Sequence, residues 1–332
     1  MSEASVRWLL VGTGDIARKR VGPALVAAAN SQLAAVCGRN PERTAAFAAE
    51  LGARTCFTDF DEAVTHPDIS AVYLATLVDQ HVPQAMAALN AGKHVLVEKP
   101  LGLSGEECQA LLSLAAGTRR VAGCSYYRRC SSRFAHASEL LATGELGEIV
   151  LVRMAYRAWF NPSAEDPKRW RVQKSSSGGG PLADVGSHML DLLIGLLGMP
   201  RTVVAAVRTL VQPYAVEDSA GLVFELQNGA LATGSFHWNS KTWAHEFEIV
   251  GTEGSLKWIP FDTGPVVKTV GRDSTEIRLP QPENVHLPLI EDFVRAIRGN
   301  LQPAVPLTEA VKANRLLDAI YRSSEEGRAV AI

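Results

Sequence analysis

Short apolar runs alternate with amphipathic stretches over the first 124 residues of the chain. The apolar runs predict buried strands over residues 6–11, 33–37, 54–57, 69–75, 94–97 and 120–124. Stretches with helical spacing lie between them and predict helices over residues 41–51, 59–64, 82–90 and 104–116. Strands that alternate with helices in this way are typical of a doubly wound α/β domain with a parallel sheet.

After Ser125 the pattern changes, and strands dominate. A helix that ends at Gly144 precedes predicted strands over residues 149–157, 201–211, 218–226, 231–238, 245–250 and 255–258. Two helices, over residues 285–298 and 308–321, close the chain. The series predicts an α+β domain over residues 125–332 with a large open, mostly antiparallel sheet, after an α/β domain over residues 1–124.

One face of that second sheet needs cover, by a helix or by another subunit. Its strands carry apolar residues that are expected to make this face an exposed hydrophobic surface, for example Leu222, Phe224 and Leu226. We therefore expect a homodimer or homotetramer built on the sheet.

Composition narrows the classes of partner and the compartment. The 332 residues include 33 basic and 35 acidic side chains, a formal charge of −2 that suggests neither nucleic acid nor an anionic membrane as partner. No apolar run approaches the length of a spanning helix, and the first residues lack the apolar core of a signal peptide. The five cysteines are scattered without a CxxC pair, which favours reduced thiols in a cytoplasmic protein.

A glycine-rich turn of the GxGxxA type follows the first strand. Gly12 permits the tight turn, Gly14 lets the backbone approach a pyrophosphate, and Ala17 allows close packing of helix on strand. The following helix presents its first N–H groups to the phosphates. A structural turn is the alternative, but the strand–turn–helix context predicts a dinucleotide site.

The end of the second strand bears on the choice of cofactor. An NAD site usually carries an acidic residue there to bond the ribose, whereas this chain has Gly38 and Arg39, with Arg43 one helical turn on. Two arginines could bind a 2′-phosphate by charge-assisted hydrogen bonds. The alternative is that both are solvated residues at a helix start. The sequence thus favours NADP, with NAD possible.

The strand over residues 94–97 ends in Glu98, Lys99 and Pro100. A lysine at the carboxyl end of such a strand points into the crevice where open α/β sheets bind ligands. Thr76 and His81 follow the preceding strand and are placed to touch the cofactor, unless they only cap the next helix. For the EKP tripeptide alone, a surface Lys–Glu pair is the simpler interpretation.

A second chemical element spans residues 178–193, where a glycine tract leads into a helical segment. Asp184 and His188 are four residues apart and share one helical face, with Asp191 near it. A carboxylate one turn from a histidine is the pairing that a general base needs. A capping aspartate with a buried histidine is the alternative. We expect no metal site, because no dense cluster of metal-ligating residues occurs elsewhere.

Together these motifs resemble the Gfo/Idh/MocA oxidoreductases, the glucose–fructose oxidoreductase and inositol dehydrogenase family. The resemblance covers nearly the whole chain, with GTGDIA at Gly12, AGKHVLVEKPL at Ala91, GGGPLADVGSHMLDLL at Gly178 and GTEGSL at Gly251. It implies a Rossmann domain followed by an α+β domain whose open sheet often serves oligomerisation. It also implies that Lys99, Asp184 and His188 match the catalytic positions.

Finer resemblance is to the branch that contains bacterial 1,5-anhydrofructose reductases. Trp170 and Arg171 resemble a WR pair that lies near the cofactor there, and Arg43 matches an arginine used for the NADP phosphate. Family members often carry Asn near Ser125 or Tyr126, so the substrate pocket is expected to differ. The predicted cofactor-binding residues are Gly12, Thr13, Gly14, Asp15, Ile16, Gly38, Arg39, Arg43, Thr76, His81, Glu98, Lys99, Trp170 and Arg171.

The expected reaction is hydride transfer between a nicotinamide and a carbinol or carbonyl carbon of a sugar, polyol or related cyclic substrate. Lys99 is expected to stabilise charge on the substrate oxygen, His188 to move the proton and Asp184 to orient His188 or bind a hydroxyl. Whether Lys99 or His188 transfers the proton stays open. Two alternatives remain: an NAD-dependent glycosidase with a transient redox step, and a non-catalytic nucleotide-sensing regulator.

Overall fold

The computed structural model describes residues 5–332, which divide into two compact units. The first unit holds the described residues up to Ser131 together with Gln281–Val311, and the second holds Ser132–Pro280 and Lys312–Ile332. The sequence suggests one boundary after Cys124. The chain instead passes between the units more than once, because the helix α9 (Leu287–Gly299) packs with the first unit.

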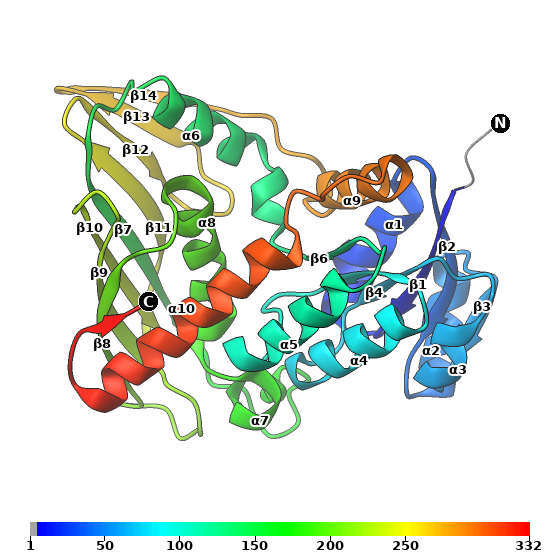
Figure 1. Ribbon diagram of the computed structural model, residues 1–332. Coiled ribbons are helices and arrows are strands. Elements are labelled where there is room, and N and C mark those ends of the chain that lie inside the picture. Colours follow the sequence, from blue (N-terminus) through cyan, green and yellow to red (C-terminus); the bar gives the residue numbers. More distant parts are fainter. Residues whose placement is uncertain (1–4) are drawn as a thin grey trace. The chain divides into compact units, whose positions relative to one another are not determined.

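The first unit is built on a parallel sheet of six strands in the order β3-β2-β1-β4-β5-β6 (Figure 1). The order reverses between β1 and β4, which makes the carboxyl ends of these strands the topological switch point where ligands bind. The predicted doubly wound fold is confirmed. Its strands are β1 (Val6–Val11), β2 (Ser31–Cys37), β3 (Thr55–Phe57), β4 (Ala71–Leu74), β5 (His94–Val97) and β6 (Ala122–Cys124).

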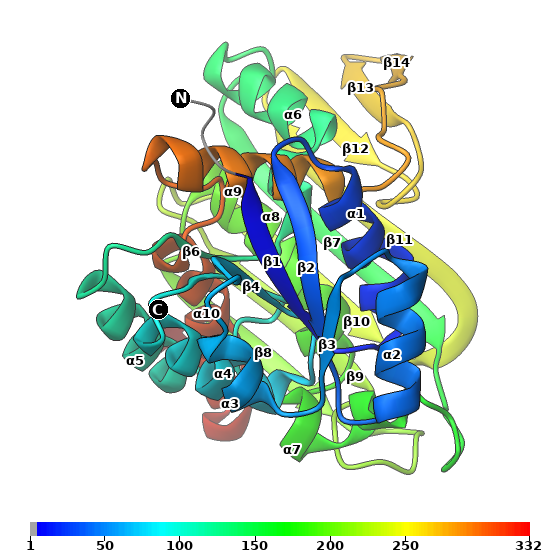
Figure 2. The ribbon, with the colours of Figure 1, turned by 90° about the vertical axis from the view of Figure 1, so that its right-hand side faces the viewer.

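Helices cover this sheet, and α4 and α5 lie side by side in both ribbon views (Figures 1 and 2). The α5 helix begins with a capping box, in which the Ser104 hydroxyl and the Glu107 carboxylate each accept a backbone N–H. The helical segments are η1 (Ala17–Val21), α1 (Gly22–Ala27), α2 (Pro41–Glu50), α3 (Phe60–Thr65), α4 (Val78–Asn90), α5 (Gly105–Ala116) and η2 (Tyr127–Cys130).

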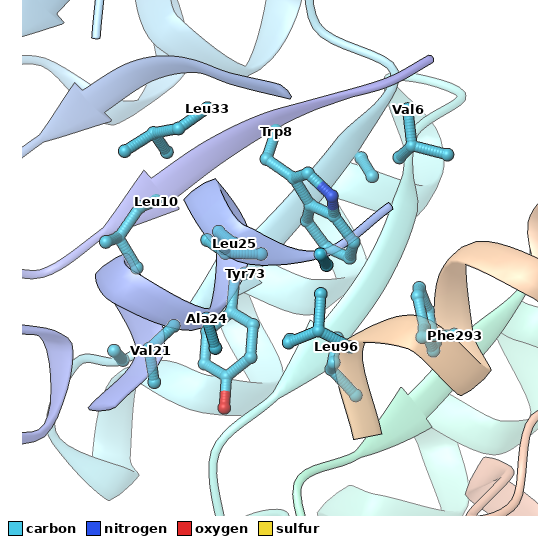
Figure 3. Packing of buried hydrophobic residues seen from close by; sticks show 14 of the residues in the cluster. Val6, Trp8, Leu10, Val21, Ala24, Leu25, Leu33, Tyr73, Leu96 and Phe293 are labelled. Atoms are coloured by element: carbon cyan, nitrogen blue, oxygen red, sulfur yellow. The ribbon is translucent and has the colours of Figure 1, made fainter. Parts of the chain in front are cut away.

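The core of the first unit explains why a late segment belongs to it. Trp8 on β1 is fully buried, and its ring lies 5.7 Å from that of Phe293 on α9 (Figure 3). Leu25 and Phe47 from the early helices join the same cluster. Each large side chain buried in this way stabilises the fold by about 1.5–3 kcal/mol. Return of α9 to β1 is therefore driven by apolar burial.

The second unit contains a sheet of nine strands in the order β14-β13-β12-β11-β7-β10-β9-β8-β15. The β10–β7 pair is parallel and the other pairs are antiparallel, which confirms the mostly antiparallel expectation. The strands are β7 (Ile149–Trp159), β8 (Thr202–Arg208), β9 (Ser219–Glu225), β10 (Leu231–His237), β11 (Asn239–Gly251), β12 (Gly254–Trp258), β13 (Val266–Val270), β14 (Asp273–Ile277) and β15 (Val330–Ala331).

Helical segments of the second unit include the one that carries the Asp184 motif. They are α6 (Ser132–Ala142), η3 (Arg169–Val172), α7 (Lys174–Ser177), η4 (Leu182–Gly186) and α8 (Ser187–Leu197). The last helix, α10 (Leu307–Glu326), crosses the division between the units. None of the helices within residues 5–332 is both long and apolar enough to cross a membrane.

The apolar residues exposed on the second sheet are not the ones that the sequence predicted. Leu222, Phe224 and Leu226 are all buried, so the expectation that they form an exposed hydrophobic face is wrong. Alternate strand residues point to opposite faces, and the exposed apolar residues of the sheet include Val223 (45% exposed) and its cross-strand neighbour Val204 (50% exposed). Alternation predicts two faces but does not say which of them is covered.

Candidate active site

The turn after β1 has the geometry of a dinucleotide loop. Gly12 has a φ of +107°, and a Cβ there would overlap the carbonyl oxygen of Ala75, so only glycine fits. At Gly14 a Cβ would meet no atom within 4 Å, which leaves the backbone open to a close ligand. Ala17 is fully buried. The loop therefore fits a bound pyrophosphate, while Asp15 and Ile16 are exposed beside it.

The arginine predicted for NADP lies at this loop. The Arg43 guanidinium donates to the Thr13 carbonyl, and the Arg43 backbone N–H donates to Asn40 Oδ1 at 2.8 Å, which caps α2. Gly38 and Arg39 form the tip of β2, and Arg39 is exposed. The structure thus places a cationic group beside the glycine loop, at a strand tip without a carboxylate.

The carboxyl ends of β4, β5 and β6 bring the EKP segment to one edge of the sheet. The Glu98 N–H donates to the Leu74 carbonyl at 2.9 Å, and the Ser125 N–H donates to the Val97 carbonyl at 2.7 Å. Lys99 follows Glu98 and is half-buried at this edge. The predicted placement of Lys99 at the end of a buried strand is what the structure has.

The His81 ring lies between the Pro100 and Thr76 backbone carbonyls and so connects the segments that follow β4 and β5. His81 Nδ1 lies 2.8 Å from the Pro100 carbonyl oxygen, and His81 Nε2 lies 3.3 Å from the Thr76 carbonyl oxygen. The Thr76 hydroxyl donates to Gln84 Oε1 at 3.0 Å. The cap position of α4 is Leu77, which makes no side-chain capping bond, so neither residue serves as that cap. Burial lowers the pKa of His81, which keeps the ring neutral.

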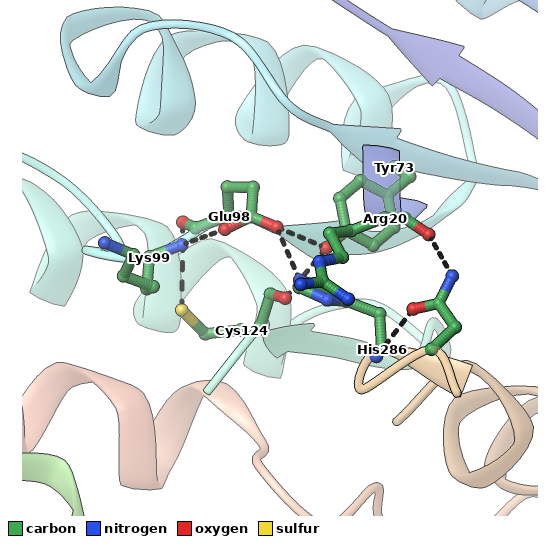
Figure 4. Close-up of polar contacts among 8 residues, drawn as sticks. Arg20, Tyr73, Glu98, Lys99, Cys124 and His286 are labelled. Atoms are coloured by element: carbon green, nitrogen blue, oxygen red, sulfur yellow. Dashed lines mark hydrogen bonds and ion pairs between the residues drawn. The ribbon is translucent and has the colours of Figure 1, made fainter. Parts of the chain in front are cut away.

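Glu98 faces the interior of the first unit (Figure 4). Glu98 is 6% exposed, and its carboxylate accepts a hydrogen bond from the Tyr73 hydroxyl at 2.6 Å. His286 Nε2 lies 3.4 Å from the same oxygen. Burial by itself raises the pKa of Glu98, but His286, Tyr73 and Lys99 outweigh burial and hold that pKa below its ordinary value. A contact of Glu98 with the cofactor stays a prediction.

In the second unit, Asp184 and Arg171 form an ion pair at 3.2 Å. Asp184 lies in η4, while His188 lies in the first turn of α8 and is half-buried. The Arg171 guanidinium lies 5.6 Å from the centre of the Trp170 ring. The structure thus brings together one residue predicted to bind the cofactor and one predicted to be catalytic.

A buried carboxylate fixes the segment that leads to Asp184. Glu217 accepts hydrogen bonds from the Leu182 N–H and the Tyr321 hydroxyl, each at 3.2 Å. A Cβ at Gly180 would overlap the Glu217 carbonyl, so glycine is required for this approach. Burial raises the pKa of Glu217. Sequence reasoning missed Glu217 and Tyr321, as it missed Tyr73 and His286, because isolated polar residues in strands and helices carry no local signal.

No group of three or more metal-ligating side chains is found among residues 5–332. The five cysteines are free thiols, and Cys37, Cys108 and Cys124 are buried. Burial raises the pKa of Cys37 to about 11, so this thiol is protonated at neutral pH.

Comparison with known proteins agrees with this geometry. Residues 6–126 match the family described as an oxidoreductase family with an NAD-binding Rossmann fold. Residues 134–257 match the GFO/IDH/MocA C-terminal domain. Both of the predicted halves of the chain are therefore those of one family, and its Rossmann half binds a nicotinamide cofactor.

Individual relatives span the whole chain. A 1,5-anhydro-D-fructose reductase of Ensifer adhaerens is 30% identical over 331 residues, 98% of each chain. An NADP(+)-dependent D-xylose 1-dehydrogenase of Haloferax volcanii is 29% identical and covers 97% of this chain and 98% of its own. The crystal structure of an aldose–aldose oxidoreductase from Caulobacter crescentus, complexed with glycerol, superposes with a TM-score of 0.90 at 25% identity, covering 99% and 100% of the two chains. These relatives give no support to a glycosidase or a regulator, and the chain belongs to the Gfo/Idh/MocA family of oxidoreductases.

Proposed function

We propose that this enzyme transfers hydride between a nicotinamide cofactor and a carbinol or carbonyl carbon of a sugar, polyol or related cyclic substrate. The observation that carries the proposal is the half-buried Lys99 at the carboxyl end of β5, in the unit that holds the Gly12 loop. The substrate class is supported by relatives that are a 1,5-anhydro-D-fructose reductase and a D-xylose 1-dehydrogenase.

The bound cofactor supplies the hydride chemistry, and the side chains supply charge and protons. Lys99 donates a hydrogen bond to the substrate oxygen and stabilises the negative charge that develops on it during reduction. His188 exchanges a proton with the same oxygen. Asp184, which is paired with Arg171, binds a substrate hydroxyl or orients His188.

We propose further that NADP is preferred over NAD. Support comes from the strand tip formed by Gly38 and Arg39, which lacks a carboxylate, and from the Arg43 guanidinium beside Thr13. A 2′-phosphate there would gain charge-assisted hydrogen bonds instead of meeting a repulsive carboxylate. The remaining predicted cofactor contacts, among them Thr76, His81 and Trp170, belong to the same proposal.

We also propose a homodimer or homotetramer that forms on the open face of the nine-stranded sheet. The exposed pair Val204 and Val223 supports this proposal, with Leu231 (49% exposed) on a neighbouring strand. Light scattering at micromolar concentration is expected to give a multiple of the chain mass. A monomeric mass for the wild type would contradict the proposal. So would a multimeric mass that a Val204→Lys/Val223→Lys variant leaves unchanged.

The five free thiols fit a reducing compartment, and we propose that the enzyme works in the cytoplasm. Cell fractionation with a cytoplasmic and an extracytoplasmic marker tests this location. Recovery of the enzyme with the extracytoplasmic marker would overturn it.

Fluorescence titration with NADPH and NADH, followed by a panel of sugars and polyols with the tighter cofactor, tests the function. We expect tighter binding of NADPH and turnover that shows as a change in the absorbance of the reduced nicotinamide. Binding of either cofactor without turnover of any substrate in the panel, in both directions, would count against a sugar or polyol oxidoreductase.

A further inference from the structure

A chain of buried polar side chains begins behind the sheet edge that carries Lys99 (Figure 4). Tyr73 and Ser125 are both fully buried, and their hydroxyl oxygens are 2.7 Å apart. The Tyr73 hydroxyl has one proton, and the Glu98 carboxylate at 2.6 Å can only accept it. The Ser125 hydroxyl therefore donates to the Tyr73 oxygen, and the phenol donates to Glu98.

His286 approaches Glu98 from the segment that returns before α9. It is 1% exposed, and its Nε2 lies 3.4 Å from Glu98 Oε1. Its ring lies 4.6 Å from the Tyr127 ring, and its backbone N–H donates to Asn284 Oδ1 at 3.0 Å. The Asn284 amide donates in turn to the Arg20 carbonyl at 2.7 Å, so the position of His286 is fixed from two sides.

The second oxygen of Glu98 serves the next residue. Glu98 Oε2 accepts the backbone N–H of Lys99 at 3.2 Å. Tyr73 thus holds Oε1 by a hydrogen bond, His286 Nε2 lies 3.4 Å from the same oxygen, and Oε2 holds the Lys99 backbone. Such a buried carboxylate stays charged only while its hydrogen-bond and charge partners are present.

We propose that Tyr73 and His286 are positioning residues that fix Lys99 through the ionised Glu98 carboxylate. This inference rests on the proposed role of Lys99 at the substrate oxygen. A reacting group displaced by about 1 Å can lose roughly 100-fold in rate, so a rigid backbone at Lys99 has a direct catalytic value. The titratable and charged groups around the carboxylate are Tyr73, His81, Lys99 and His286, with the Cys124 thiol against the Glu98 backbone carbonyl and Arg20 beside the network.

Three variants test the network without touching substrate. Tyr73→Phe removes one hydroxyl, and His286→Leu removes the partner on the other side of Glu98. We expect each to lower kcat by roughly 10-fold, with much smaller changes in KM and in NADPH affinity by fluorescence titration. His286→Gln keeps an N–H donor near the position of Nε2 and is expected to recover most of the rate. Val64→Ala, a core truncation in α3, controls for loss of stability alone.

The pH profile adds a readout that a merely structural role would not move. Loss of either partner removes an interaction that lowers the pKa of Glu98, so its protonation should begin at higher pH. The acid limb of the kcat profile is therefore expected to shift to higher pH in Tyr73→Phe and in His286→Leu. In Val64→Ala the limb should stay where it is in the wild type.

Lys99→Met separates failure of this inference from failure of the proposed function. If Tyr73 acts through Lys99, Tyr73→Phe should cost little further rate in the Lys99→Met background, because the two effects are coupled. Independent losses that multiply in the double variant would overturn the positioning role, as would an unshifted acid limb. A fully active Lys99→Met variant would instead overturn the proposed function.

Discussion

The Arg171 guanidinium and the Asp184 carboxylate lie 3.2 Å apart, with side chains that are 36% and 17% exposed. This ion pair joins η3 to η4, and it is more shielded than an ordinary surface pair. Arg171 supplies a positive charge beside the Asp184 carboxylate, which the proposed mechanism places at the substrate. The proposed roles of these two residues are therefore tested together.

Arg171→Ala tests that pair. It removes one charged hydrogen bond to the Asp184 carboxylate, and loss of a bond worth about 1.5–3 kcal/mol predicts a fall in kcat/KM of roughly 10- to 100-fold. Arg201→Ala breaks an exposed pair with Glu225 and serves as the control, with kcat/KM close to wild type. Equal kinetics for the two variants would show that the Arg171 pair has no role in the reaction.

Lys99→Met removes the positive charge while roughly keeping the side-chain volume. We expect kcat to fall by at least about 100-fold, the usual scale for loss of an electrostatic or acid–base group. His188→Asn should act similarly and also remove one step from the pH–rate profile. NADPH affinity should change little in both, because the Gly12 loop is proposed to hold the pyrophosphate. Full activity of the Lys99→Met variant would show that Lys99 is no more than a strand-end ion-pair residue.

Arg39→Ala and Arg43→Ala test cofactor choice. Each should weaken NADPH more than NADH, and together they should cost on the order of 2–4 kcal/mol of NADPH binding if both arginines contact the 2′-phosphate. Arg119→Ala, an exposed cation before β6, is the control for loss of charge alone. Wild-type protein that binds NADH as tightly as NADPH contradicts the preference.

Gly12→Ala and Gly14→Ala form a matched pair. The first adds a Cβ that overlaps the Ala75 carbonyl at a φ of +107°, so we expect lower stability, by about 1–3 kcal/mol, and loss of cofactor binding. The second adds a Cβ in open space and should change the melting temperature little while it weakens the cofactor. Thermal unfolding without and with NADPH separates the two effects.

Asp218 predicts a pH dependence of stability. Its buried carboxylate accepts the backbone N–H groups of Leu210, Val211 and Gln212 at 2.9, 2.7 and 2.8 Å. Burial raises its pKa, but these hydrogen bonds outweigh burial and lower it overall. The stabilisation is therefore present above the unfolded pKa of about 3.9 and is lost as the pH falls through the lower folded pKa.

Asp218→Asn should accordingly lower the melting temperature at pH 7, and the deficit relative to wild type should shrink as the pH falls below about 4. Asp273→Asn, at an exposed position of β14, is the control and should change the melting temperature little at either pH. A deficit that does not depend on pH would show that the ionised form of Asp218 is not what stabilises the 210–212 loop.

The sequence predicted correctly those features that depend on residues close to one another along the chain. The strands β1 and β5 match their predicted bounds, because fully buried parallel strands are continuous apolar runs. The Gly12 turn and the position of Lys99 followed from the same runs. The hairpin of β13 and β14 was missed, because β14 is a mostly exposed edge strand without apolar alternation.

The sequence by itself determined the two-part fold, the glycine loop and the residue types of the proposed chemistry. Tertiary structure alone decided that Val204 and Val223, and not Leu222, lie on the open sheet face, since periodicity defines two faces without saying which is covered. It also decided that His286 lies against Glu98, far away in the sequence. That contact exists because α9 buries its apolar side on β1, and burial is a non-directional force that leaves no local pattern at the polar residues it brings together.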